Sequence, residues 1–335
     1  MGWRTLVTAR AFWVSGQDAN AALERAGCEV VRSPEAGPVP EDQLIGLLRD
    51  CDAIIGSSDP YTARLFESCP GLKIVSRCGV GIDSVDLPAA TEAGVIVTNT
   101  PGAMTDAVGD YTFALILGIA RRIAEGDALM RSGGWGEFPG VLVRGKTLGL
   151  VGLGQIGQAV AKRSAGFGMR VLAFDPPQAA KGAPPGLPPV EFVSLEQLLA
   201  ESDFVSVHAP ALPETRGLFN GERFAQMKPT AYFINTARGS LVDDAALVDA
   251  LTRGRIAGAA IDVYNQEPCP PDHPLRRAPR CLLTPHNAFN AAEAAAAMSL
   301  LSAEAVIDLS QDRRPASVCN PAVWDSPALR AKEAR

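Results

Sequence analysis

Three residues in the second half of the chain have side chains that could bind a carboxylate and move a proton: Arg238 in I-N-T-A-R-G, Glu267 in A-I-D-V-Y-N-Q-E-P and His286 in L-T-P-H-N. An arginine can bind a carboxylate through a planar two-pronged contact and polarise a neighbouring carbonyl. A histidine whose far nitrogen is held by a carboxylate keeps its proton more tightly and becomes a usable acid near neutral pH. We therefore interpret Glu267 and His286 as a pair that could protonate a ketone oxygen as a hydride reaches its carbon, and remove an alcohol proton in reverse.

Each of these residues also has a structural interpretation. Arg238 is compatible with a surface charge in a tight turn, Glu267 with a solvated loop residue before a proline, and His286 with a hydrogen-bonded histidine beside a proline. The chain has only two other histidines. His273 lies in a polar, proline-containing loop and is interpreted as structural, whereas His208 ends a predicted strand and is assigned to the adenine side of a cofactor site.

A glycine-rich stretch upstream is suited to bind a dinucleotide that could supply such a hydride. Residues 147–151 form a short apolar run typical of a strand buried on both faces. The run ends in G-L-G-Q-I-G at 152–157, which matches G-x-G-x-x-G between a strand and a helix. The first glycine permits a tight turn, the second lets the main chain approach a pyrophosphate, and the third lets the helix pack closely on the sheet. The N–H groups at the helix start then face the phosphates.

The next predicted strand, 169–174, ends at Asp175, which lies 18 residues after Gly157. A carboxylate at this point can accept hydrogen bonds from both ribose hydroxyls of NAD, and it repels the extra phosphate of NADP. An aspartate followed by two prolines is also a common strand-ending turn. Because strand, helix and carboxylate agree in position, we predict NAD as the cofactor, bound by Gly152, Gly154, Gln155, Ile156, Gly157 and Asp175.

Short β-branched runs that alternate with helical segments are predicted to position all these residues. This alternation predicts parallel sheets with helices on both faces, where the loops after the strands converge on a ligand. In the first hundred residues, we predict strands at 5–9, 28–32, 52–56, 73–76 and 95–98 and helices near 16–26, 41–49, 60–68 and 86–93. Farther on, we predict helices near 103–122, 194–200, 221–227 and 243–253, strands at 204–207, 231–235, 258–262 and 281–284, an extended surface loop at 176–189, and a helix from 291.

The composition is typical of a globular protein with two domains: 335 residues, 47% hydrophobic and 20% charged. A net charge of -6 without a basic block argues against a nucleic-acid partner. The seven cysteines are never spaced C-x-x-C, so they indicate neither a disulfide framework nor a metal site, and we expect a cytoplasmic protein. The apolar run within 111–120 is about half the length of a membrane-spanning helix, and the N-terminus lacks a signal-peptide core, so we expect no membrane association.

Four separated motifs resemble, in the same order, those of the D-isomer-specific 2-hydroxyacid dehydrogenase family, which includes phosphoglycerate dehydrogenases and glyoxylate/hydroxypyruvate reductases. The resemblance runs from about residue 50 to about residue 290. The motifs are S-R-C-G-V-G-I-D-S-V-D-L at 76–87, G-L-G-Q-I-G at 152–157, N-T-A-R-G at 235–239, and D-V-Y-N-Q-E-P followed downstream by T-P-H.

The resemblance implies a role for each matching residue. Arg238 would bind the substrate, His286 would be the acid/base, and Glu267 would be its partner. Asp262 would face the nicotinamide. The implied substrate-binding main chain is that of Cys78, Gly79, Val80 and Gly81, with Cys78 and Tyr61 lining the pocket, and the implied cofactor-binding residues also include His208, Pro210, Thr215, Thr236, Ala237, Arg238, Asp262 and His286.

The resemblance also implies an architecture and a reaction. The fold would be α/β with two doubly wound parallel-sheet domains: a Rossmann NAD-binding domain over 100–288, and a flavodoxin-like, discontinuous substrate domain over 1–99 and 289–335. The helix near 103–122 would cross between the domains and help to form a homodimer, and closure of the domains would exclude water. The implied enzyme is an NAD-dependent oxidoreductase that interconverts a small 2-oxo acid and its D-2-hydroxy acid.

Two departures and one retained residue refine the expected substrate. Residues 285–289, P-H-N-A-F, resemble D-lactate-type members rather than the more usual P-H-x-G. Gly56 stands where phosphoglycerate dehydrogenases often have an arginine for the phosphate, so phosphoglycerate is not favoured, and Glu267 replaces the amide expected of a formate dehydrogenase. Two alternatives remain: an NAD(H)-sensing, corepressor-like binding protein, and a phosphite dehydrogenase on the same scaffold.

Overall fold

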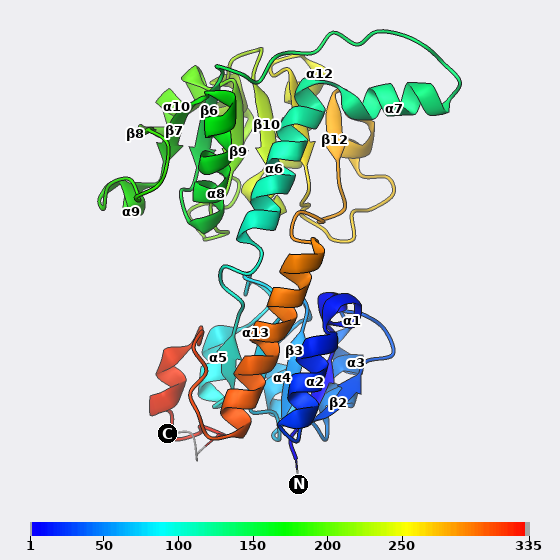
Figure 1. The fold of residues 1–335 in the computed structure, drawn as a ribbon, viewed down its shortest axis with the longest axis vertical. Helices are drawn as coiled ribbons and strands as arrows, with labels where there is room; N and C mark the ends of the chain where they lie inside the picture. The colour runs from blue at the N-terminus through cyan, green and yellow to red at the C-terminus, as the bar shows by residue number, and fades with distance from the viewer. Residues whose placement is uncertain (1, 332–335) are drawn as a thin grey trace. The chain divides into compact units, whose positions relative to one another are not determined.

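The computed structural model describes residues 2–331, and the chain divides into two compact units. Among the described residues, unit 1 comprises 2–104 and 290–331, and unit 2 comprises 105–289. The sequence prediction put these boundaries at 99/100 and 288/289. Each unit contains one parallel sheet, which confirms the predicted class of two parallel-sheet α/β domains (Figure 1).

Unit 1 has the strand order β2-β1-β3-β4-β5, the flavodoxin-like doubly wound order. All four residues of β3 are buried, as expected for a parallel strand covered on both faces. The long helix α13, from the far end of the chain, packs against α1 and α2 (Figure 1). The elements are β1 Arg4–Val7, α1 Arg10–Ser15, α2 Gln17–Arg25, β2 Glu29–Arg32, α3 Glu41–Leu48, β3 Ala53–Gly56, α4 Ala63–Ser68, β4 Ile74–Arg77, α5 Leu87–Glu92, β5 Ile96–Thr98, α13 Ala292–Ser310 and η4 Pro321–Asp325.

Unit 2 has the strand order β12-β11-β10-β9-β6-β7-β8, a Rossmann arrangement with its switch point between β6 and β9. Side chains alternate between the two faces: Val171 and Ala173 join the apolar core beside α6 and α8, whereas Leu172 joins the opposite core. The elements are α6 Thr105–Ala120, α7 Ile123–Arg131, β6 Thr147–Val151, α8 Gln155–Ser164, η1 Ala165–Phe167, β7 Arg170–Phe174, α9 Pro176–Ala179, β8 Val190–Phe192, α10 Leu195–Glu201, β9 Phe204–Val207, α11 Gly221–Ala225, β10 Tyr232–Asn235, η2 Gly239–Leu241, α12 Asp244–Thr252, β11 Gly258–Ile261, η3 Pro274–Arg277 and β12 Cys281–Leu283.

The proline-rich segment 176–189 differs from the extended loop that the sequence predicted. It begins with the short helix α9, because Asp175 accepts a hydrogen bond from the Gln178 N–H at 2.9 Å and prolines occupy the first helical positions. The edge strand β8 begins at Val190, directly after this segment. The helices α1 and α7 were also not predicted.

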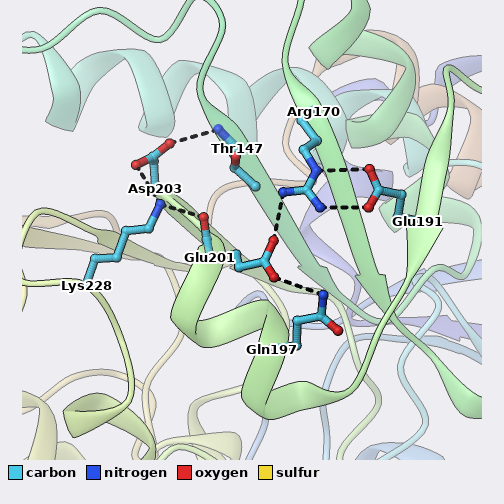
Figure 2. Close-up of polar contacts among 7 residues, drawn as sticks. All are labelled: Thr147, Arg170, Glu191, Gln197, Glu201, Asp203 and Lys228. Atoms are coloured by element: carbon cyan, nitrogen blue, oxygen red, sulfur yellow. Dashed lines mark hydrogen bonds and ion pairs between the residues drawn. The ribbon is translucent and has the colours of Figure 1, made fainter.

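A charged network covers the amino edge of the unit 2 sheet (Figure 2). Arg170, at the start of β7, donates to both oxygens of Glu191 at 2.9 and 2.7 Å and to Glu201 at 2.7 Å. Beside it, Asp203 accepts from the Thr147 N–H at 2.9 Å. Exposed ion pairs of this kind stabilise little, typically below about 1 kcal/mol each. The network lies at the opposite end of the strands from the candidate site residues, so we interpret it as structural.

Candidate active site

The glycine loop after β6 has the geometry that a pyrophosphate needs. Gly152 has a φ of 97°, in the left-handed region that favours glycine. A Cβ at Gly157 would lie 2.3 Å from Gly152 O, so the start of α8 packs directly on the turn. Gly154, by contrast, has open space around it, and a Cβ there would meet no protein atom within 4 Å. No contact within the protein therefore requires glycine at position 154. A ligand that approaches the main chain would require it, as a phosphate bound at the α8 N-terminus would do.

Asp175 lies at the tip of β7, as predicted, and is tied to the glycine loop. One carboxylate oxygen accepts the Leu153 N–H at 2.7 Å, and the other accepts the Gln178 N–H at 2.9 Å. Each carboxylate oxygen can accept a further hydrogen bond. Asp175 is therefore held in place and keeps acceptor capacity for ribose hydroxyls.

Five further predicted cofactor residues, His208, Pro210, Thr215, Thr236 and Ala237, lie in loops after β9 and β10. The Nε2 atom of His208 is 2.9 Å from the Ser206 hydroxyl, and burial lowers the pKa of His208 to about 4, so the ring is neutral near pH 7. The Thr215 hydroxyl donates to Pro210 O at 2.7 Å and closes the loop after His208. The Thr236 hydroxyl points toward Thr112 of α6, at 3.1 Å. Contact of these residues with the cofactor stays a prediction.

Arg238 follows β10 in a turn that the buried Asn235 side chain organises. The Asn235 amide accepts from the Ala237 N–H at 3.0 Å and donates to Arg238 O at 2.9 Å. A Cβ at Gly239 would lie 2.0 Å from the Tyr264 carbonyl carbon, so this turn packs closely on the chain after β11. No role for Asn235 was predicted from the sequence. Its position could have indicated such a role, because a polar residue at the last position of a buried strand needs hydrogen-bond partners.

Glu267 and His286 are in direct contact. His286 Nδ1 lies 2.6 Å from Glu267 Oε2, and Glu267 Oε1 accepts the Tyr264 N–H at 2.9 Å. Burial raises the pKa of the Glu267 carboxyl, but the hydrogen bond and charge of His286, helped by the charge of Arg238, bring that pKa below its ordinary value. Within residues 2–331, no group bonds to His286 Nε2, which leaves that nitrogen available to a substrate.

The loop that carries His286 is held by Asp262, whose side chain is fully buried. The Asp262 carboxylate accepts from the Thr284 hydroxyl at 2.6 Å, the Asn287 N–H at 2.9 Å and the Ala288 N–H at 3.0 Å. The loop gives His286 a left-handed φ of 51°, a conformation that costs energy in a non-glycine residue. The structure thus assigns Asp262 to the histidine loop, while its predicted contact with the nicotinamide stays a prediction.

In unit 1, residues 78–81 follow β4. The Cys78 N–H donates to Gly56 O and the Gly79 N–H donates to Arg77 O, both at 2.9 Å. Within the described part of the chain, the N–H groups of Val80 and Gly81 donate no hydrogen bond. Of the four residues predicted to bind the substrate carboxylate, Val80 and Gly81 thus keep N–H groups available for a ligand, and contact of this segment with a substrate stays a prediction.

The two side chains predicted to line the substrate pocket are buried from solvent. Cys78 is 8% exposed and Tyr61 is 0% exposed. Burial raises the pKa of the Cys78 thiol. The Tyr61 hydroxyl is bonded to the buried Asp59 at 3.0 Å, and a place for Tyr61 in the substrate pocket stays a prediction.

The described residues contain no group of three or more His, Cys, Asp or Glu side chains placed to hold a metal ion. Among the same residues, no helix combines the length and the apolar character needed to cross a bilayer. The candidate site of unit 2 contains an arginine, a carboxylate-bound histidine and a glycine loop suited to a dinucleotide.

The chain is similar in sequence and in structure to known proteins. Residues 113–288 match the sequence model described as D-isomer specific 2-hydroxyacid dehydrogenase, NAD binding domain. A glyoxylate reductase of Thermofilum pendens is 42% identical over 301 residues, which cover 88% of this chain and 88% of that protein. A D-3-phosphoglycerate dehydrogenase of Mycobacterium tuberculosis is 43% identical over 257 residues, 76% of this chain but 48% of that protein. The crystal structure of the TT0316 protein from Thermus thermophilus superposes with a TM-score of 0.85 and 40% identity, covering 94% of this chain and 99% of that one.

Proposed function

The chain belongs to the D-isomer specific 2-hydroxyacid dehydrogenase family, and from this premise we propose that it interconverts a small 2-oxo acid and its D-2-hydroxy acid with a nicotinamide dinucleotide. The observation that carries the proposal is the 2.6 Å contact between His286 and Glu267, close enough to Arg238 for its charge to act on the carboxyl. This set can bind an oxo acid and move one proton, which is the acid/base chemistry that carbonyl reduction needs.

Each residue has a defined task in this reaction. Arg238 binds the substrate carboxylate and polarises the carbonyl. For unit 1, we propose that the N–H groups of Val80 and Gly81, within the predicted segment 78–81, bind a substrate carboxylate. Glu267 accepts a hydrogen bond from the Nδ1–H of His286, so Nε2 donates its proton to the carbonyl oxygen during reduction and accepts a proton from the alcohol in oxidation. A reduced nicotinamide, when bound, supplies the hydride.

We propose a small substrate because of the relatives that match this chain over most of their own length and because of the close packing at Gly56. The relatives with 88% mutual coverage include a glyoxylate reductase, whereas the phosphoglycerate dehydrogenase match spans less than half of that protein. A Cβ at Gly56 would lie 1.7 Å from the Tyr61 hydroxyl, so position 56 has no room for a phosphate-binding side chain. These observations support a small, unphosphorylated oxo acid.

The test is NADH oxidation by the purified protein with glyoxylate, hydroxypyruvate, pyruvate and phosphohydroxypyruvate. We expect turnover with the small oxo acids and a much lower kcat/KM with the phosphorylated one. Absence of turnover on every oxo acid, with NADH still bound, would contradict the proposal and favour the sensing alternative. Formation of NADH from NAD and phosphite would favour the phosphite alternative.

We propose NAD rather than NADP as the preferred cofactor, because of the Asp175 carboxylate. Asp175→Asn keeps an acceptor for the Gln178 N–H but removes the charge that repels a 2′-phosphate. We expect the kcat/KM ratio for NADH over NADPH to fall roughly 10- to 100-fold, the value of one charged hydrogen bond. Asp243→Asn is the matched control, since Asp243 also caps a helix through the Ala245 and Ala246 N–H groups. An unchanged ratio in Asp175→Asn would remove Asp175 from cofactor selection.

We also propose that the chain forms a homodimer through residues 123–142. The helix α7 has no buried residue, and it projects from unit 2 with the segment after it (Figure 1). Monomeric proteins rarely expose several large apolar side chains along one stretch, and such surfaces often form subunit interfaces. The large apolar side chains exposed along this stretch are Ile123 (60%), Met130 (55%), Trp135 (88%), Val141 (38%) and Leu142 (69%).

For this dimer, light scattering after size exclusion should give twice the 35.2 kDa chain mass for the wild type. Leu142→Glu places a charge on the apolar stretch and should shift the protein toward monomer without loss of helical circular dichroism. A wild-type monomer at micromolar concentration would contradict the proposal.

The cytoplasmic location also remains a proposal, supported by seven free cysteines and testable by cell fractionation.

A further inference from the structure

We propose that Asp59 is a positioning residue for the substrate: its buried carboxylate holds residues 78–86 so that the N–H groups of Val80 and Gly81 stay aligned for a 2-oxo acid. The inference rests on the proposed function, in which these N–H groups bind the substrate carboxylate. Asp59 lies in G-S-S-D-P-Y-T after β3, outside the four family motifs.

The Asp59 side chain is fully buried, and its hydrogen bonds come from four neutral donors. These are the Thr8 hydroxyl at 2.6 Å, the Val39 N–H at 2.7 Å, the Ser57 N–H at 2.9 Å and the Tyr61 hydroxyl at 3.0 Å. A carboxylate removed from water is destabilising unless such bonds replace its hydration. The donors come from the loops after β1 and β3 and the loop before α3, so one side chain ties these loops together at the carboxyl edge of the sheet.

This edge is the switch point of unit 1, where β1 and β3 are neighbours and ligands of open parallel sheets usually bind. In unit 1, the side chains of Asp59 and Tyr61 occupy this switch point. A Cβ at Gly56 would lie 1.7 Å from the Tyr61 hydroxyl, and a Cβ at Gly37 would lie 2.5 Å from an Asp59 oxygen. Neither glycine has a positive φ, so close packing rather than backbone conformation requires glycine at both positions.

Tyr61 connects this buried cluster to the segment that carries the substrate-binding N–H groups. Its own N–H donates to Ser84 O, and its carbonyl accepts the Asp86 N–H, both at 2.9 Å. At the other end of the segment, Gly56 O accepts the Cys78 N–H at 2.9 Å. Both anchors therefore depend on the packing around Asp59, and the two substrate-binding N–H groups lie between them.

The test is Asp59→Asn, which keeps the volume but replaces one acceptor oxygen with a donor. We expect the KM for glyoxylate to rise about tenfold or more, because the misaligned N–H groups lose hydrogen bonds to a charged ligand. The Kd for NADH should stay at the wild-type value, since the glycine loop belongs to the other unit.

The matched control is Asp52→Asn at the amino edge of the same sheet. The Asp52 carboxylate accepts from the Arg4 N–H and from Lys73 Nζ, both at 2.8 Å. Its loss should lower the urea midpoint of unfolding but leave the KM for glyoxylate unchanged. A purely structural role for Asp59 would make the two variants behave alike.

Tyr61→Phe keeps the inference testable where Asp59→Asn does not fold. It removes one of the four donors and retains the ring, so the KM should rise about two- to fivefold with NADH binding unchanged. An unchanged KM in the folded variants, or an equal rise in Asp52→Asn, would overturn the inference and leave the proposed function intact. Lack of turnover by the wild type on any oxo acid would overturn the proposed function, and the inference with it.

Discussion

Replacing His286 with alanine should lower kcat for glyoxylate reduction about 10²–10⁴-fold, the range that a positioned general acid contributes. The expected loss is large because Nδ1 is tied to Glu267 at 2.6 Å and leaves only Nε2 to move the proton. The Kd for NADH, measured by fluorescence titration, should change little, because the glycine loop follows a different strand. Stopped-flow measurement of NADH oxidation under saturating substrate gives the rate of the chemical step separately from binding.

His273→Asn is the matched control for this prediction. His273 also contacts an acid, with Nε2 3.3 Å from Asp244 Oδ2, but it lies in the loop before η3. We expect His273→Asn to reduce stability and to retain kcat. Wild-type kcat in His286→Ala would rule out the acid/base assignment, and equal loss in both variants would point to damage to unit 2 as a whole.

Arg238→Ala should lower kcat/KM about 10²–10⁴-fold. Two charge-assisted hydrogen bonds of about 1.5–3 kcal/mol each are lost, and the carbonyl is no longer polarised. Arg238→Lys should fall between the wild type and the alanine variant, because lysine keeps the charge but cannot form the planar two-pronged contact. Initial rates over a range of glyoxylate concentrations at saturating NADH give kcat and KM separately.

Arg223→Ala is the control for loss of an arginine from the same unit. Arg223 forms an ion pair with Glu196 at 2.7 Å near the surface, and such pairs contribute little. We expect its kcat and KM to match the wild type. If Arg238→Ala raised KM but left kcat unchanged, Arg238 would bind ground state and transition state equally, which contradicts its role in polarising the carbonyl.

Sequence reasoning succeeded where local physics decides the structure. The strands β6 and β7 were predicted because their apolar runs are short and follow turn residues. The glycine loop was predicted because its requirements belong to the turn itself, as the φ of 97° at Gly152 shows. The helix α9 was missed because it has only four residues and begins with two prolines, which read as an extended segment. The strand β8 was missed because three residues at a sheet edge carry little pattern.

The sequence by itself determined which side chains stand after which strands, namely Asp175, Arg238, Glu267 and His286. It did so because the apolar period of a strand and the residues that end it are properties of neighbouring positions. Only the tertiary structure decided what those side chains contact. Glu267 and His286 are 19 residues apart and meet at 2.6 Å because β11 and β12 are adjacent and parallel, so the loops after them lie together.

The roles of the two buried aspartates were likewise decided only by the tertiary structure. Asp262 accepts from residues of the histidine loop more than 20 positions away, and Asp59 accepts from Thr8, 51 positions away. Hydrogen bonding and exclusion of volume depend on distances in space, and those distances exist only once the strands have paired. For that reason the candidate catalytic side chains could be predicted from the sequence, whereas the buried groups that hold their loops could be identified only in the folded chain.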